Sequence, residues 1–148
     1  MADTPMQTAK TPWHLWTIGA ISLLWNAVGV VDFVMTQTKN EAYMGQFSPE
    51  QLEYFYGFPL WVVTAWGVAT WGSLLGSVLL LLRRKLTVVV NLVVLVAMGL
   101  TFVHNFVLSD GLKLMGGVGP AIFTAVIVLV GVLLLVYARA MLRRGVLR

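Results

Sequence analysis

Three basic residues interrupt a long apolar run at residues 79–90, LLLLRRKLTVVV. The apolar residues reach back to residue 59 before this break and forward to residue 108 after it. Each run is as long as the roughly 20 residues that an α-helix needs to cross the hydrocarbon core of a bilayer. The stretch therefore predicts a helical hairpin, 59–82 and 86–108, with a short basic turn between its helices.

Two further apolar runs, 14–36 and 120–138, complete a pattern of four membrane-spanning helices. The 148-residue chain is 59% hydrophobic and only 11% charged. Water-soluble domains are about 45–50% apolar and about 25% charged. We therefore expect an all-α integral membrane four-helix bundle in which residues 1–148 form one transmembrane domain, with the lipid bilayer as its surroundings.

The ten Lys and Arg residues fall unevenly on the connections between these helices. One side of the membrane receives only Lys39 and Lys113. The other side receives eight basic residues: Lys10, Arg83, Arg84, Lys85, Arg139, Arg143, Arg144 and Arg148. Because basic connections stay in the cytoplasm, both termini are expected to be cytoplasmic, in a bacterial inner membrane. The net charge of +4 is thus a topology signal, and nucleic acid is not an expected partner.

The connection 37–58 is the one long external segment. Within it, Ser48-Pro49-Glu50-Gln51 has the spacing of a capping box, which predicts a short helix at about 49–56. Its aromatic residues suit the outer interface, where rings lie between headgroups and acyl tails. This helix either anchors the ends of the spanning helices or forms a lid over an external site.

Polar residues in the spanning helices supply the candidate binding site. An ionisable group in hydrocarbon costs from roughly 2.5 to more than 10 kcal/mol, so Asp32 needs a partner. His104 and Asn105 lie at the same depth of the third helix, and we expect Asp32 to pair with one of them. Asn26 and Asn91 extend the polar stripes inward, as further binding candidates. The alternative is that Asp32 only locks two helices together.

The residues expected in catalytic or cofactor sites are sparse. The chain has no cysteine and two histidines, His14 and His104, which belong to opposite ends of the bundle and cannot hold one haem between them. No phosphate-binding loop, series of metal ligands or serine with a plausible base is present. We therefore expect no catalytic residue, no metal site and no cofactor, and a protein that is not an enzyme.

Helix 59–82 carries small residues at every fourth position, which allow helix backbones to approach closely. This surface faces either a helix of the same chain or a second copy. Substituting leucine for a glycine on it should lower stability or disrupt an oligomer, whereas Leu80→Val should be mild. The helix-packing residues are Ala65, Ala69, Gly72, Ser73, Gly76 and Ser77.

Two segments near the external helix ends resemble one another: residues 32–36 (DFVMT) align with residues 105–109 (NFVLS). Each is followed by a loop and a helix that begins near a proline. The match fits a parallel tandem repeat, from which some transporters are built. Chance similarity between apolar segments explains it equally well.

Four short motifs follow one another at a familiar spacing: residues 25–30 (WNAVGV), 48–50 (SPE), 59–61 (PLW) after Tyr56, and 81–85 (LLRRK). In these the chain resembles an uncharacterised family of small four-helix bacterial inner-membrane proteins, sometimes labelled sugar transporters. The resemblance extends to residues 105–109, although the external helix before residue 59 is shorter here. It implies the four-helix fold and supplies no binding residues.

Two non-enzymatic functions are compatible with these features. The first is a small transporter or solute-binding protein that acts as a homo-oligomer, which requires Asp32 to be reachable from water. The second is an accessory or assembly subunit of a larger membrane complex. It requires buried, paired polar groups and no continuous cavity, with the small-residue surface and the aromatic loop as contacts.

The distribution of basic residues generates a prediction about topology. Reporters fused at Ala2, Lys85 and Arg148 should be cytoplasmic, and reporters at residues 41–53 and at Lys113 external. Accessibility labelling in whole cells measures this. Cytoplasmic labelling of residues 41–53 would overturn the arrangement.

Overall fold

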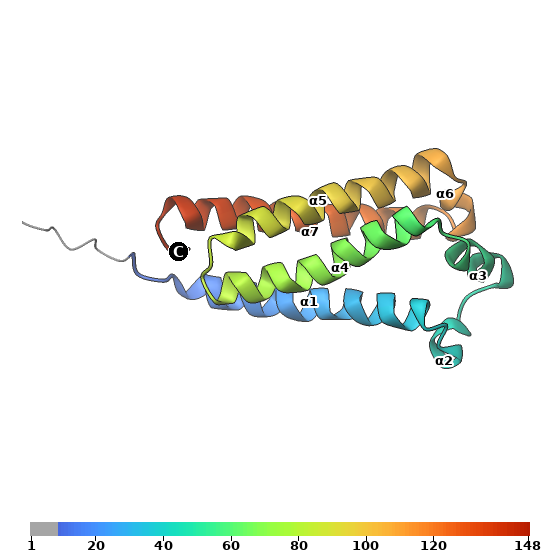
Figure 1. The fold of residues 1–148 in the computed structure, drawn as a ribbon, viewed down its shortest axis with the longest axis horizontal. Coiled ribbons are helices and arrows are strands. Elements are labelled where there is room, and N and C mark those ends of the chain that lie inside the picture. The colour runs from blue at the N-terminus through green and yellow to red at the C-terminus, as the bar shows by residue number, and fades with distance from the viewer. Residues whose placement is uncertain (1–8) are drawn as a thin grey trace, which may run out of the picture.

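The computed structural model describes residues 9–148, and these residues form helices and connections with no strand. Four helical segments in them are long and apolar enough to span a membrane (Figure 1). These are α1 (Trp13–Gln37), α4 (Leu60–Leu81), α5 (Leu86–Val103) with its π-helical continuation η1 (His104–Leu108), and α7 (Val118–Arg143). The predicted all-α, four-helix membrane architecture is confirmed.

Three short helices gather at one end of the bundle: α2 (Glu41–Met44), α3 (Pro49–Tyr56) and α6 (Gly111–Leu114) (Figure 1). The capping box at the start of α3 is present, since the Gln51 amide donates to the Ser48 hydroxyl at 3.2 Å and the Ser48 amide to the Gln51 side chain at 3.0 Å. Helices α2 and α6 were not expected, because a single helical turn is too short to give a hydrophobic period.

The opposite end of the bundle holds residue 9, residue 148 and the turn between α4 and α5 (Figure 1). There the Lys85 amide donates to an Arg148 backbone oxygen at 2.9 Å, and the Arg148 amide to the Arg83 carbonyl at 2.7 Å. The last residues are thus tied to the basic turn. Both ends of the described chain lie on the side of the bundle where the basic residues cluster, as the predicted topology requires.

Helix α4 lies between α1 and α5 and packs against both, while α7 packs mainly against α5. Helix α4 therefore lies between the outer ends of α1 and α5, where Asp32 was expected to meet His104 or Asn105. Helical periodicity places residues on a face, but it leaves open which neighbour that face meets. Helix α7 is the least covered of the four, with 11% of its most apolar window buried.

The small-residue surface of α4 is used inside the chain. A Cβ built on Gly72 would lie 2.7 Å from Val94 Cγ2 of α5, and one built on Gly76 would collide with the Asn91 side-chain oxygen. The neighbouring small residues are also buried: Ala65, Ala69, Ser73 and Ser77. Leu80 is 1% exposed in the core, so it is a poor choice for a mild substitution.

Two expected helix bounds need correction. The last spanning helix begins at Val118 and ends at Arg143, where 120 and 138 were expected. Its final turns include Arg139 and Arg143, because arginine is a good helix former and does not end a helix that leaves the hydrocarbon.

The contact at Gly76 generates a stability prediction. Gly76→Leu should lower the free energy of unfolding by about 1–3 kcal/mol, because the side chain would force α4 and α5 apart. Gly99→Leu is the matched control, since nothing lies within 4 Å of a Cβ at Gly99. Thermal unfolding in detergent measures both, and equal melting temperatures would contradict the packing described.

Candidate functional site

Asp32 lies in the outer part of α1, where its partner is a tyrosine of the external segment. The Tyr43 hydroxyl of α2 donates to Asp32 Oδ1 at 2.5 Å. Asp32 makes no hydrogen bond to His104 or Asn105, so the expected direct pairing is wrong. The reason is that α4 separates α1 from α5, and the nearest suitable donor comes from the connection that follows α1.

His104 and Asn105 form a second external cluster on η1. The His104 Nδ1 atom lies 3.1 Å from Asn105 Oδ1, which also accepts a hydrogen bond from the Tyr54 hydroxyl of α3 at 2.9 Å. The same hydroxyl lies 2.9 Å from Ser109 Oγ. His104 is buried, and its ring is surrounded by three aromatic rings at centroid distances of 6.4, 5.3 and 5.6 Å: Tyr54, Phe58 and Trp61.

The π-helical turn η1 positions this cluster. The Ser109 hydroxyl donates to the His104 carbonyl, five residues earlier, at 2.7 Å and so satisfies a carbonyl at the helix end. Gly111 fits against the Asn105 carbonyl, where any Cβ would collide. π-Helical turns are frequent at functional sites. Here the turn brings His104 and Asn105 against α3.

The two aligned segments, 32–36 and 105–109, have the same local contacts. In each, the side chain of the first residue accepts a hydrogen bond from a tyrosine hydroxyl: Asp32 from Tyr43 and Asn105 from Tyr54. In each, the hydroxyl of the fifth residue donates to the carbonyl of the first, at 2.8 Å in the former and 3.3 Å in the latter. The sequence similarity therefore corresponds to two equivalent attachment points for the external helices.

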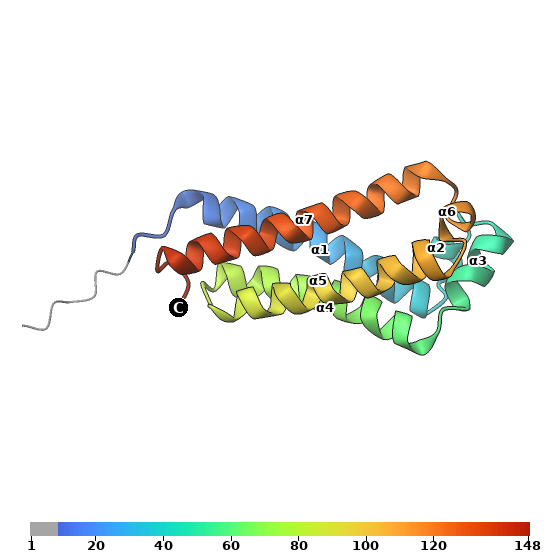
Figure 2. The same ribbon diagram turned by 90° about the horizontal axis from the view of Figure 1, so that it is seen from above.

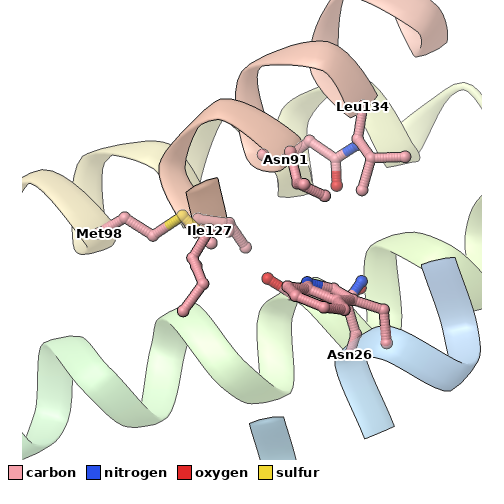
Figure 3. Close-up of a pocket in the computed structure, with 10 residues that line it drawn as sticks. Asn26, Asn91, Met98, Ile127 and Leu134 are labelled. Atoms are coloured by element: carbon pink, nitrogen blue, oxygen red, sulfur yellow. The ribbon is translucent and has the colours of Figure 1, made fainter. Parts of the chain in front are cut away.

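The polar stripes of α1 and α5 do face one another deeper in the bundle, across a small cavity (Figure 3). The cavity has about 20 Å³ open to the centres of water molecules, which is room for about one water. All four spanning helices line it. The lining residues are Trp25, Asn26, Ser73, Asn91, Val94, Met98, Ile127, Val130, Gly131 and Leu134.

Asn26 and Asn91 face this cavity from opposite sides (Figure 3). The Asn26 Nδ2 group donates to the Ser73 carbonyl at 3.1 Å and to Ser77 Oγ at 2.8 Å. Within residues 9–148, Asn26 Oδ1 and the Asn91 amide make no hydrogen bond. Carboxamides donate and accept without titrating. The cavity therefore supports binding of one small neutral molecule and supplies no acid or base.

No fully buried side-chain nitrogen or oxygen in residues 9–148 lacks a hydrogen-bond partner. The same residues contain no cluster of three His, Asp or Glu side chains with the spacing of a metal site. Hydrogen bonding and packing are thus the chemistry that the interior presents.

Of the predicted binding residues, the structure brings Asn26 and Asn91 to one cavity and His104 and Asn105 to one external cluster, and it leaves Asp32 apart from both. The sequence interpretation missed Tyr43 and Tyr54 as hydrogen-bond donors. Their signal is the amphipathic nature of tyrosine, whose hydroxyl seeks a partner when its ring is covered at an interface.

No protein-family model, curated protein or solved structure matches this chain. The resemblance carried by residues 25–30, 48–50, 59–61 and 81–85 therefore stays a prediction.

The Tyr43 hydroxyl generates a prediction about pH. Its hydrogen bond to Asp32, then burial, then the charge of Asp32 raise the pKa of Tyr43 to about 12. Because this folded-state pKa exceeds the ordinary value of about 10, the bond stabilises the attachment of α2 to α1 fully below pH 10, and this contribution is lost as pH rises through about 12.

The check is a tyrosinate absorbance titration, with the Tyr43 component taken as the difference between wild type and Tyr43→Phe. Asp32→Ala should lower the pKa of Tyr43 toward about 10, since it removes both the acceptor and the charge. Tyr54, whose pKa is raised by burial, is the internal control and should not respond. An unchanged Tyr43 component in Asp32→Ala would rule the pair out.

Proposed function

We propose that this protein is a non-enzymatic accessory or assembly subunit of a larger membrane complex, in a bacterial inner membrane with both termini cytoplasmic. The observation that supports it is the closed interior of the bundle. Within residues 9–148 every fully buried side-chain nitrogen and oxygen has a hydrogen-bond partner, and the cavity lined by Asn26 and Asn91 admits about one water. These are the features expected of a subunit whose polar residues hold helices together.

The size of the cavity argues against solute binding by a single chain. Sites for small molecules are typically of about 300–1,000 Å³. A cavity of about 20 Å³ is far smaller. A path for a polar solute across the bilayer would also require polar groups facing water along its length, whereas α7 presents apolar side chains to the cavity: Ile127, Val130 and Leu134.

The external helices offer the contact surface for a partner. The small-residue surface of α4 is already covered by α1 and α5, so a partner meets other residues. Tyr56 of α3 is exposed, with the Lys39 ammonium 4.7 Å from its ring centroid. The connections at this end hold two lysines, Lys39 and Lys113, and four acidic residues, Glu41, Glu50, Glu53 and Asp110. This excess of acidic residues favours a partner with basic or polar groups there.

A second candidate function is a small transporter or solute-binding protein that acts as a homo-oligomer. Asn26 Oδ1 and the Asn91 amide favour it, since both face the cavity with hydrogen-bonding capacity to spare. In this case several copies would enclose the solute path, because one copy does not.

Extraction of the tagged protein, expressed at its native level, into a mild detergent tests these proposals. We expect a stable complex with another membrane protein. Glu53→Lys in α3 should weaken this complex, because it reverses an exposed negative charge on the proposed contact surface. Asn91→Leu should lower the melting temperature but leave the complex assembled, because Asn91 faces the interior. A homo-oligomer without any partner, whose binding of a co-purified solute is abolished by Asn91→Leu, would contradict the subunit role and support the second candidate.

A further inference from the structure

Helix α7 crosses α1 in the view of Figure 2. An apolar groove of about 460 Å³ lies along α7 beside Ile18 of α1. Ile18 of α1 forms one wall and α7 supplies the rest. The groove exposes no polar surface, although Tyr137 lines it. Its residues on α7 are Val130, Leu133, Leu134, Val136, Tyr137 and Ala140.

The length of the groove matches one leaflet of a bilayer. Val130 and Ala140 are its outermost residues on α7, and at 1.5 Å per residue they lie about 15 Å apart along the helix axis. The hydrocarbon core is about 30 Å thick. A groove of half that thickness suits an acyl chain of one leaflet, whereas a transmembrane helix of a second copy would use an apolar surface across the whole core.

A hydrogen bond between α1 and α7 fixes the end of the groove nearest the chain termini. The Tyr137 hydroxyl lies 2.6 Å from His14 Nδ1, and the two rings are 5.6 Å apart at their centroids. This contact uses the polar atom of Tyr137 and leaves its ring to line the groove. The two helices are thereby held at a fixed separation, so the groove is a built feature of the bundle.

Arg144 caps the C-terminal end of α7, four residues beyond Ala140, the last residue that lines the groove. It follows Tyr137 by seven residues, which at 100° per residue places it within about 20° of Tyr137 around the α7 axis and about 10 Å further along it. Arg144 is exposed. Arg139, also exposed, lies about 140° from Arg144 around the same axis and therefore faces away from the groove.

The charged side chains of residues 9–148 around this end of the groove are basic. The acidic side chains of residues 9–148 all belong to the opposite half of the bundle: Asp32, Glu41, Glu50, Glu53 and Asp110. A phosphate group placed near Arg144 would therefore meet basic groups without competition from an acidic side chain of residues 9–148. Basic residues beside a groove between transmembrane helices are suited to anionic lipid headgroups.

We propose that this groove is a binding site for an anionic glycerophospholipid, with one acyl chain along α7 between Val130 and Ala140 and the phosphate at Arg144. The apolar lining of the groove suits the acyl chain, and the groove's length suits a chain that stays within one leaflet. The position of Arg144 suits the negative charge of the headgroup. This site is separate from the interior cavity and does not depend on the function proposed above.

Native mass spectrometry of the full-length protein in detergent, titrated with phosphatidylglycerol or with phosphatidylcholine, tests the site. The wild type should bind one phosphatidylglycerol in preference to phosphatidylcholine. Arg144→Gln should weaken phosphatidylglycerol binding about fivefold, the effect of one basic residue near a membrane surface. Arg139→Gln, which removes the same charge from the other side of α7, should leave that binding unchanged.

A second variant tests the chain-binding part of the groove. Ala140→Leu fills the groove without changing the charge and should weaken binding of both lipids. Equal losses for Arg144→Gln and Arg139→Gln would show that diffuse charge attracts the lipid and would overturn the proposal. Unchanged binding in Ala140→Leu, or a second copy cross-linked through cysteines placed in the groove, would overturn it as well.

Discussion

The close approach of α1 and α5 to the small-residue surface of α4 is the contact on which the rest of the bundle depends. Lipid tails are as apolar as leucine, so helices in a membrane gain little from hiding apolar side chains and associate through close packing and hydrogen bonds. Both are concentrated on α4. From one side the Asn26 amide bonds to the Ser73 carbonyl and Ser77 hydroxyl, and from the other Asn91 lies against Gly76. The small side chains are what allow two asparagines to reach the same helix.

The central position of α4 also determines how the outer end is built. Because α4 separates α1 from α5, Asp32 and Asn105 make no hydrogen bond to one another. Each instead accepts a hydrogen bond from a tyrosine hydroxyl of the connection between α1 and α4. The tyrosines, Tyr43 and Tyr54, belong to consecutive short helices of one connection. That connection is therefore attached at two points, to α1 and to η1, and the polar residues at the ends of these helices hold α2 and α3 in place. Residues 49–56 were expected either to anchor the ends of the spanning helices or to form a lid. These hydrogen bonds fit an anchor.

The fold could be predicted from the sequence because its determinants are local. An apolar run of membrane length needs no knowledge of its neighbours, and neither does the basic turn at residues 83–85 or the capping box at Ser48 and Gln51. The partner of Asp32 could not be predicted, since the order of helices around a bundle is a property of all four together. Counting residues from the helix ends predicted that Asp32, His104 and Asn105 lie toward the same end of the bundle, but position along a helix does not identify a neighbour. The four-residue helix that carries Tyr43 is likewise below the length at which a hydrophobic period can be read.

The uneven packing of the four helices bears on what the protein does with its surface. Helices α1, α4 and α5 are joined by backbone contact and by asparagine side chains, whereas α7 packs mainly on α5 and meets α1 through side chains such as Tyr137 and Phe123. Gly131 brings α7 within reach of Leu95 and Met98 of α5, so the helix is seated at its middle. Toward the N-terminal end of α7 none of its residues is buried, whereas Ala138 and Met141 near its other end are buried in a cluster with Leu15 and Leu80. In a membrane, each apolar surface that the chain leaves uncovered is covered by lipid or by another protein. Where the chain itself makes few contacts to α7, these surrounding contacts have the larger share in positioning the helix. The interior of this bundle is therefore fixed by α4, while its exterior along α7 is completed by the membrane.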